Sequence, residues 1–211
     1  MAIRKPDYET VICKFIRGTP GALYDLGVGP KTEWSKLAAR YPQMAVCGCE
    51  PDPRQFAALE PRFPGRLLPV AIAEREGPAT LHLPTGDRKC CSLLPIGYAD
   101  SQVEVTCWTL DKFDREMNAP DRILLWADIE GSELTALRSG IRLLASGRVR
   151  WINLEERRPG AKTTAGWARP DEIRALLESL NYVRVADYNR HPTHQDVIYV
   201  HREERCSASS Q

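Results

Sequence analysis

A glycine-rich turn and an acid about 20 positions after it are the first residues whose types and spacing suggest chemistry. The turn contains Asp25, Gly27 and Gly29 and follows a short apolar run, and Glu50 ends the next apolar run. Glycines before a helix N-terminus let the backbone approach an anionic ligand, and an acid at that later position typically binds ribose hydroxyls. The pattern therefore favours a nucleoside-like ligand. Because Thr32 stands where a dinucleotide motif has its third glycine, a pyrophosphate would be poorly bound.

Acidic residues and a histidine at later strand ends could take up a proton during catalysis. Asp128 and Glu130 follow the apolar run ILLWA, Glu155 follows the next apolar run, and His194 lies in a polar turn near the C-terminus. Carboxylates and imidazoles are the usual general bases of enzymes. Two of these residues have a structural alternative. Asp128 could cap a helix, and His194 could be part of its turn together with His191 without a catalytic role. The spacing alone leaves both interpretations open.

Short apolar runs alternate with helical patterns along most of the chain. This alternation predicts a doubly wound α/β domain with a parallel sheet, whose ligands bind beyond the carboxyl ends of the strands. We expect helices at 32–41, from Pro53 onward, at 134–144 and at 170–181. The expected strands span 22–26, 45–49, 67–72, 123–127 and 149–154, with an antiparallel pair at 182–188 and 196–201.

Residues 79–107 interrupt this alternation with two strand-like segments. They predict an inserted hairpin, or flap, whose loop from 85 to 101 covers the site. We expect a single domain over residues 1–203 and a disordered tail at 204–211.

Composition excludes several classes of protein. Lysine and arginine total 29 against 28 acids, a net charge of +1, so nucleic acid is a disfavoured partner. No apolar run approaches the roughly 20 residues that span a bilayer, and the N-terminal residues lack the apolar core of a secretion signal, so we predict a cytoplasmic protein without membrane contact. The seven cysteines form no CxxC pair, which favours reduced thiols and neither a disulfide scaffold nor a metal site.

Several of these segments together resemble the FkbM family of class I S-adenosylmethionine (SAM) dependent methyltransferases, over roughly residues 22 to 200. The most specific stretch is LLWADIEGSELTALRSGIRLL, and the other segments are DLGVG, CEPDPRQFAAL, VAIAEREGPATLHL and VTCWTLDKF. The resemblance implies a Rossmann-like, mostly parallel seven-stranded sheet with an antiparallel last strand. It also implies methyl transfer, usually to a hydroxyl oxygen.

Site residues follow from the same resemblance. Asp25, Gly27 and Gly29 would surround the methionine end of SAM, Glu50 would bind the ribose hydroxyls, Ala71 and Ile72 would lie near the adenine, and Asp128 would face the methionine amino group or the acceptor. Lys31 could neutralise the methionine carboxylate or remain a solvated lysine. The chain departs from the family where Gly29 and Lys31 replace an asparagine and a glycine, and where Trp126 replaces a frequent lysine.

The sequence thus predicts a SAM-dependent O-methyltransferase acting on a hydroxyl of a sugar, another glycan or a small metabolite. The candidate bases are Asp128, Glu130, Glu155 and His194, and no metal is required. One alternative is a binding module that keeps the fold without catalysis. A nicotinamide-dependent oxidoreductase is a weaker alternative because the third glycine is missing.

Overall fold

A seven-stranded sheet forms the centre of the computed structural model, which describes residues 11–30, 33–84, 90–97, 99–158, 166–188 and 191–206. The strand order is β3-β2-β1-β7-β8-β10-β9, and β10 runs antiparallel to both of its neighbours while the pairs among β3, β2, β1, β7 and β8 are parallel. The predicted fold class is therefore confirmed. The strands are β1 (Ala22–Leu26), β2 (Ala45–Cys49), β3 (Arg66–Leu68), β7 (Ile123–Ala127), β8 (Val149–Arg157), β9 (Tyr182–Tyr188) and β10 (His194–His201).

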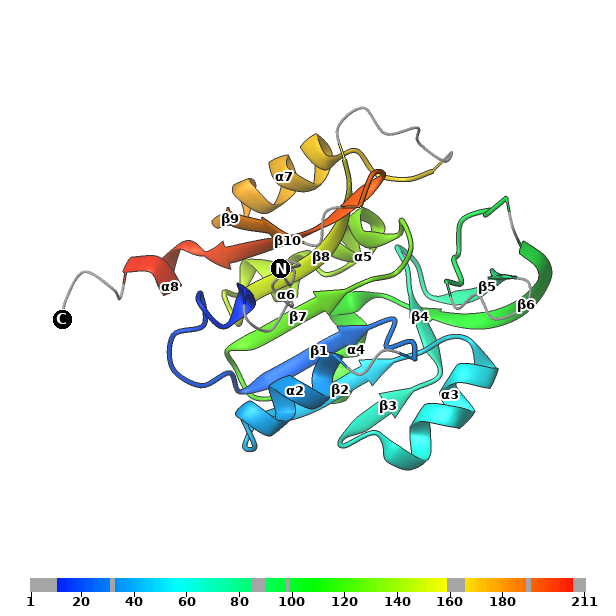
Figure 1. Cartoon of the computed structure of the whole chain (residues 1–211), viewed down its shortest axis with the longest axis horizontal. Helices are drawn as coiled ribbons and strands as arrows, with labels where there is room; N and C mark the ends of the chain where they lie inside the picture. The colour runs from blue at the N-terminus through cyan, green and yellow to red at the C-terminus, as the bar shows by residue number, and fades with distance from the viewer. Residues whose placement is uncertain are drawn as a thin grey trace, which may run out of the picture.

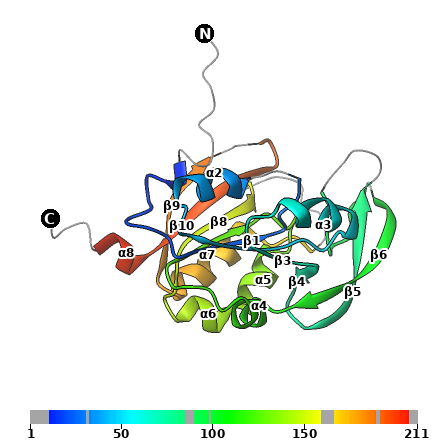
Figure 2. The same cartoon turned by 90° about the horizontal axis from the view of Figure 1, so that it is seen from below.

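Helices cover both faces of this sheet. Figure 2 shows α2 and α3 on one side and α4, α5 and α6 on the other. The helices are α2 (Glu33–Arg40), α3 (Pro53–Leu59), α4 (Leu110–Met117), α5 (Glu133–Ser139), α6 (Ile141–Ala145), α7 (Pro170–Ser179) and α8 (Arg202–Cys206), with a 3₁₀ turn at Glu60–Arg62. No helix in the described part of the chain has the length and apolar character needed to cross a bilayer.

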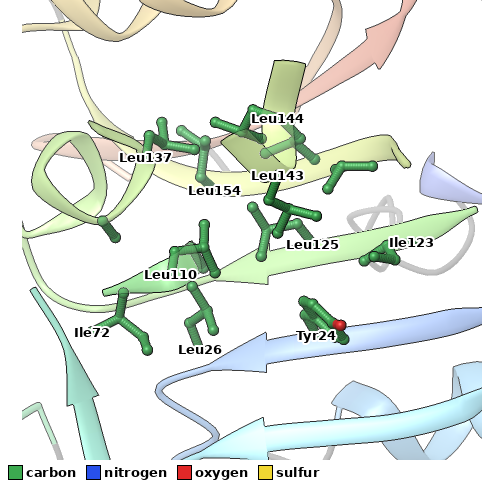
Figure 3. Close-up of a cluster of buried hydrophobic side chains, with 14 of the residues drawn as sticks. Tyr24, Leu26, Ile72, Leu110, Ile123, Leu125, Leu137, Leu143, Leu144 and Leu154 are labelled. Atoms are coloured by element: carbon green, nitrogen blue, oxygen red, sulfur yellow. The ribbon is translucent and has the colours of Figure 1, made fainter. Parts of the chain in front are cut away.

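The apolar run ILLWA forms the central strand β7, between β1 and β8. Side chains alternate across a strand, so Leu125 packs into the core beneath α4 to α6, whereas Leu124 and Trp126 belong to the core on the opposite face. Figure 3 shows Leu125 among Leu110, Leu143 and other leucines of the first core. A strand buried on both faces explains why this run contains no polar residue.

Pro69 divides the third apolar run between two sheets. The sequence predicted one strand over 67–72, but β3 ends at Leu68 in the main sheet and β4 (Val70–Ile72) begins a second sheet. Proline has no amide hydrogen, which suits a point where the chain leaves a ladder. The second sheet has the order β4-β6-β5, and the hairpin predicted at 79–107 is formed by β5 (Gly77–Pro84) and β6 (Ala99–Trp108), set apart at the right of Figure 1.

Three further predictions need correction. The helix expected at 134–144 is broken at Gly140, where a Cβ would approach the Leu110 side chain to 2.5 Å. Strand β8 continues to Arg157, so Glu155 lies within a strand and not after it. The expected disordered tail begins as helix α8, in which Glu204 is buried and pairs with Arg122 at 2.8 Å. Residues 207–211 lie outside the described residues.

Candidate functional site

A cavity of about 330 Å³ opens at the carboxyl ends of β1, β2 and β7, against the second sheet. The predicted cofactor residues line it, except Lys31, which lies outside the described residues. Those lining residues are Asp25, Gly27, Gly29, Glu50, Ala71, Ile72 and Asp128. Residues from four separate segments thus meet at one place, at the sheet edge where α/β proteins bind ligands.

The glycine turn is tied to the end of β2. The amides of Gly27 and Val28 donate to the Cys49 carbonyl at 3.0 and 3.2 Å, and the Gly29 amide donates to Oε2 of Glu50 at 2.8 Å. Gly27 has φ +77°, and a Cβ there would come within 2.6 Å of the Asp128 carbonyl oxygen. The amides of residues 27–29 are therefore used within the chain.

Glu50 is almost fully buried, with 2% of its surface exposed. Its Oε1 accepts from the Asp52 amide at 2.9 Å, so each carboxylate oxygen already has one backbone donor. Burial raises the pKa of Glu50 to about 7, and these amides partly oppose the rise. Because a carboxylate has about four acceptor positions, Glu50 can still accept hydrogen bonds from two hydroxyl groups in the cavity.

Part of the cavity wall is apolar. Ala71 and Ile72 from β4 and Leu81 from β5 contribute to it, and all three are buried. A buried acid and apolar side chains in one cavity fit a ribose with an attached base. The cavity lies near the lower end of the roughly 300–1,000 Å³ range of ligand pockets, which suits one nucleoside-sized cofactor.

A strained turn after β7 brings Asp128 and Glu130 to the cavity. Glu130 has φ +52° and Gly131 has φ +100°, and Oε1 of Glu133 accepts from the amides of Ile129 and Gly131 at 3.1 and 3.2 Å. Burial raises the pKa of Glu133 to about 8. Helix α5 is preceded by Ser132 at its N-cap, so Asp128 does not cap that helix.

Ser92 connects the hairpin to this turn. Its hydroxyl donates to the Glu130 carbonyl at 2.8 Å and accepts from the Leu94 amide at 3.0 Å, while its backbone forms a bridge with His82. Residues 90–93 line the cavity. Of the loop predicted to cover the site, residues 85–89 and 98 lie outside the described residues.

The other two predicted bases, Glu155 and His194, are not among the residues that line the cavity. Nε2 of His194 lies 3.3 Å from Oε1 of Glu155. Burial raises the pKa of Glu155 well above its usual range, and the nearby carboxylates of Asp128 and Glu130 raise it further. The four candidate bases therefore form one electrostatically connected group, with only Asp128 and Glu130 facing the cavity.

The lining residues that the sequence did not single out as site residues include Leu81, Cys91, Ser92 and Trp126. Trp126 could have been placed from strand alternation, because it faces the same side of β7 as its neighbour Asp25 on β1. Nothing local in the sequence indicates that the hairpin residues reach the cavity.

Comparison with known proteins agrees with this geometry. A model of the methyltransferase FkbM domain matches residues 7–184, whereas no curated protein matches the chain. Among solved structures, a Sulfolobus solfataricus protein described as a type 11 methyltransferase has a TM-score of 0.50 at 10% identity, covering 92% of this chain and 89% of that one. Fibrillarin from Aeropyrum pernix, bound to SAM, has a TM-score of 0.49 at 13% identity, covering 86% and 67%. At these identities the likeness concerns the fold, and the family match shows that the chain belongs to the FkbM methyltransferases.

Proposed function

We propose that this protein transfers a methyl group from SAM to a hydroxyl oxygen of a small molecule or glycan. The observation that carries the proposal is the arrangement within one cavity of the buried acid Glu50, an apolar wall and the acid Asp128. SAM supplies an electrophilic methyl group when it is bound. Six of the described cysteines, Cys13, Cys47, Cys49, Cys90, Cys91 and Cys107, are free thiols, which suits the reducing cytoplasm where we place the reaction.

Each end of the cavity suits one part of the cofactor. Glu50 would accept hydrogen bonds from the two ribose hydroxyls, and Ala71 and Ile72 would pack against the adenine. Asp25, Gly27 and Gly29 would surround the methionine portion. Lys31 follows this turn directly in the sequence and would neutralise the methionine carboxylate.

Asp128 is the residue best placed to remove the proton of the acceptor. It lines the cavity beyond β7, and its own amide donates to the Leu26 carbonyl at 3.3 Å, which anchors it beside the glycine turn. Methyl transfer requires the acceptor oxygen to lie in line with the bond that breaks, so alignment and exclusion of water can supply about 7–11 kcal/mol. Residues 90–93 would provide that exclusion.

The test combines binding and transfer. Calorimetry with SAM, S-adenosylhomocysteine (SAH) and NAD should give saturable binding of the first two only. Incubation with methyl-labelled SAM and a panel of sugars, phenols and amines should label a hydroxyl compound. Binding of NAD without SAM would overturn the cofactor assignment, labelling only of amines would overturn the hydroxyl assignment, and binding without labelling of any compound would favour the binding module.

A further inference from the structure

A row of four side chains leads from the buried part of β8 to the surface. Nε2 of His194 lies 3.3 Å from Oε1 of Glu155. Nδ1 of His194 lies 3.1 Å from Oγ1 of Thr193, and the same oxygen lies 3.0 Å from Nδ1 of His191. The side chain of Glu155 is 10% exposed, that of His194 is 32% exposed, and His191 is exposed. The four side chains thus follow one another at 3.0 to 3.3 Å and become more accessible to water from Glu155 to His191.

The backbone of the turn holds this row in place. The His191 amide donates to the His194 carbonyl at 2.9 Å, and the Arg158 amide donates to the Thr193 carbonyl at 3.0 Å. Nη1 of Arg158 also donates to the His191 carbonyl at 3.3 Å. The two imidazole rings are stacked, with centroids 4.3 Å apart and 17° between their planes. The spacing of the side chains therefore does not depend on their mutual contacts alone.

The hydrogen bonds of the row can all point the same way. A hydroxyl donates one hydrogen bond while it accepts another, so Thr193 can accept from the Nδ1–H of His194 and donate to Nδ1 of His191. A protonated Glu155 then donates to Nε2 of His194. When each hydrogen moves to the next atom, a proton passes from Glu155 to His191 without displacement of any heavy atom.

The acidic surroundings of Glu155 favour its protonated form. Burial is the largest cause of its raised pKa, which favours the protonated carboxyl group. Asp196, on β10, is the cross-strand partner of Glu155 in the sheet. The carboxylates that raise the pKa of Glu155 are those of Asp128, Glu130, Glu133 and Asp196.

Two other polar side chains of the neighbouring strands contact residues outside the row. Arg157 is the cross-strand partner of His194, and its guanidinium lies over the Trp167 ring, 3.7 Å from the centroid. Tyr188, on β9, donates its hydroxyl to Oδ1 of Asn153 at 2.6 Å. Glu155 is the acid whose carboxylate oxygen lies 3.3 Å from Nε2 of His194.

We propose that Glu155, His194, Thr193 and His191 form the path by which the acceptor's proton leaves the site for solvent. This inference rests on the proposed hydroxyl methylation. It adds a role for Thr193 and His191, which act only through Glu155 and His194.

Methyl transfer and the release of the hydroxyl proton balance in atoms and charge. The acceptor oxygen forms a bond to the methyl carbon as the carbon–sulfur bond breaks, and the electron pair of that bond stays on sulfur. Asp128 and Glu155 directly follow Ala127 and Leu154, which are partners in the parallel ladder of β7 and β8, so the two acids lie side by side on neighbouring strands. The hydroxyl proton would pass to the Asp128 carboxylate, which returns to its charged form by passing it to the Glu155 carboxyl, while Glu155 passes its own proton to His194. One proton appears at His191 for each methyl group transferred.

The first test removes one member of the row at a time. Thr193→Val lacks the hydroxyl, Thr193→Ser keeps it, and Thr106→Val makes the same change at an exposed site on β6. In dilute buffer, Thr193→Val and His191→Ala should lower kcat about tenfold or more, which is less than the 10²- to 10⁴-fold that positioned proton transfer can contribute. Thr193→Ser and Thr106→Val should have the kcat of the parent. Added imidazole should restore His191→Ala, and all four variants should bind SAH like the parent. Parent-like kcat of both Thr193→Val and His191→Ala at every pH would overturn the path.

The second test needs no acceptor and separates this inference from the proposed function. Nitrogen NMR of the imidazoles reports which nitrogen of each ring carries a hydrogen in the parent, in Glu155→Leu and in Thr193→Val. Removing the Glu155 proton donor with leucine should change the His191 nitrogen signals in the parent background and not in the Thr193→Val background. Unchanged His191 nitrogen signals in Glu155→Leu would overturn the path even if a hydroxyl is methylated, whereas methylation only of amines would overturn the proposed function even if the row is coupled.

Discussion

The Glu50 carboxylate accepts a hydrogen bond from the Gly29 amide, 2.8 Å away and 21 positions earlier in the chain. The two residues whose spacing suggested a ribose-binding acid are thus also hydrogen-bonded to each other. Their bond joins the two loops between which a cofactor would lie. Glu50 has two tasks, because the carboxylate that would bind the ribose also holds the glycine turn in place.

Cofactor affinity should increase with pH through the ionisation of Glu50. Burial raises its pKa to about 7, so the carboxylate form, which is the better acceptor for ribose hydroxyls, becomes dominant between pH 6 and 8. Calorimetry with SAH should show tighter binding at pH 8 than at pH 6 in the parent and a flatter profile in Glu50→Gln. Glu50→Ala should weaken binding by about 1.5–3 kcal/mol and also lower stability, because the Gly29 and Asp52 amides lose their acceptor. An equally steep pH profile in Glu50→Gln would contradict this assignment.

Asp128→Asn should separate cofactor binding from turnover. The amide keeps the shape of the side chain and removes its charge. We therefore expect parent-like unfolding, most of the SAH affinity, and a kcat reduced by a factor of about 10² or more. Calorimetry and labelled-methyl transfer measure the two effects. Loss of SAH binding would instead assign Asp128 to the methionine amino group, and an unchanged kcat would exclude it as the base.

Glu133 should make stability decrease as the pH rises. Its pKa in the folded protein is raised to about 8 from an ordinary value of 4.5, so its contribution is fully present below pH 4.5 and is lost as the pH rises through 8. Glu133→Gln should be more stable than the parent at pH 9, because its amide oxygen can accept the same two backbone hydrogen bonds without a buried charge. Glu133→Ala leaves both amides unpaired and should cost about 1–3 kcal/mol.

Denaturant unfolding between pH 5 and 9 measures these differences. Glu104→Gln, at an exposed position of β6, is the matched control and should follow the parent at every pH. A Glu133→Gln protein that loses stability toward pH 9 as steeply as the parent would show that another group causes the dependence.

Gly131→Ala should be strongly destabilising. Gly131 has φ +100°, and a Cβ there would approach the Trp167 ring to 2.5 Å, so both the backbone and the packing oppose a side chain. Backbone strain alone costs about 1–3 kcal/mol. Gly97→Ala is the control, since nothing lies within 4 Å of its Cβ, and it should stay within about 0.5 kcal/mol of the parent. Equal unfolding free energies for the two variants would contradict the packing of Trp167 on this turn.

Ser92→Ala should loosen the segment that borders the cavity. The change removes the bonds from Ser92 to the Glu130 carbonyl and from the Leu94 amide, each worth about 0.5–1.5 kcal/mol. Hydrogen exchange at the Leu94 amide should become faster, and bound SAH should be released more readily. Ser101→Ala, at an exposed position of β6, should leave both unchanged. Undiminished protection of the Leu94 amide in Ser92→Ala would contradict the role of Ser92.

Periodicity and spacing were enough to predict the sheet and the edge of the sheet at which Glu50 and Asp128 meet. The unbroken apolar run of β7 marks a strand covered on both faces, and alternation of strands and helices places Glu50 and Asp128 at the same sheet edge. Periodicity and spacing are properties of residues that are close in the chain, so they do not depend on how distant segments pack.

Contacts between segments that are distant in the chain could not be predicted from periodicity and spacing. The Ser92 to Glu130 bond joins residues 38 positions apart, and it exists only because Pro69 directs β4 into a second sheet that carries the hairpin over the cavity. The alignment of Glu155 with His194 depends in the same way on the antiparallel register of β8 and β10. Register, burial and the resulting pKa values arise from three-dimensional packing, because a carboxyl group that is ordinary in the unfolded chain is perturbed only when water is removed from around it.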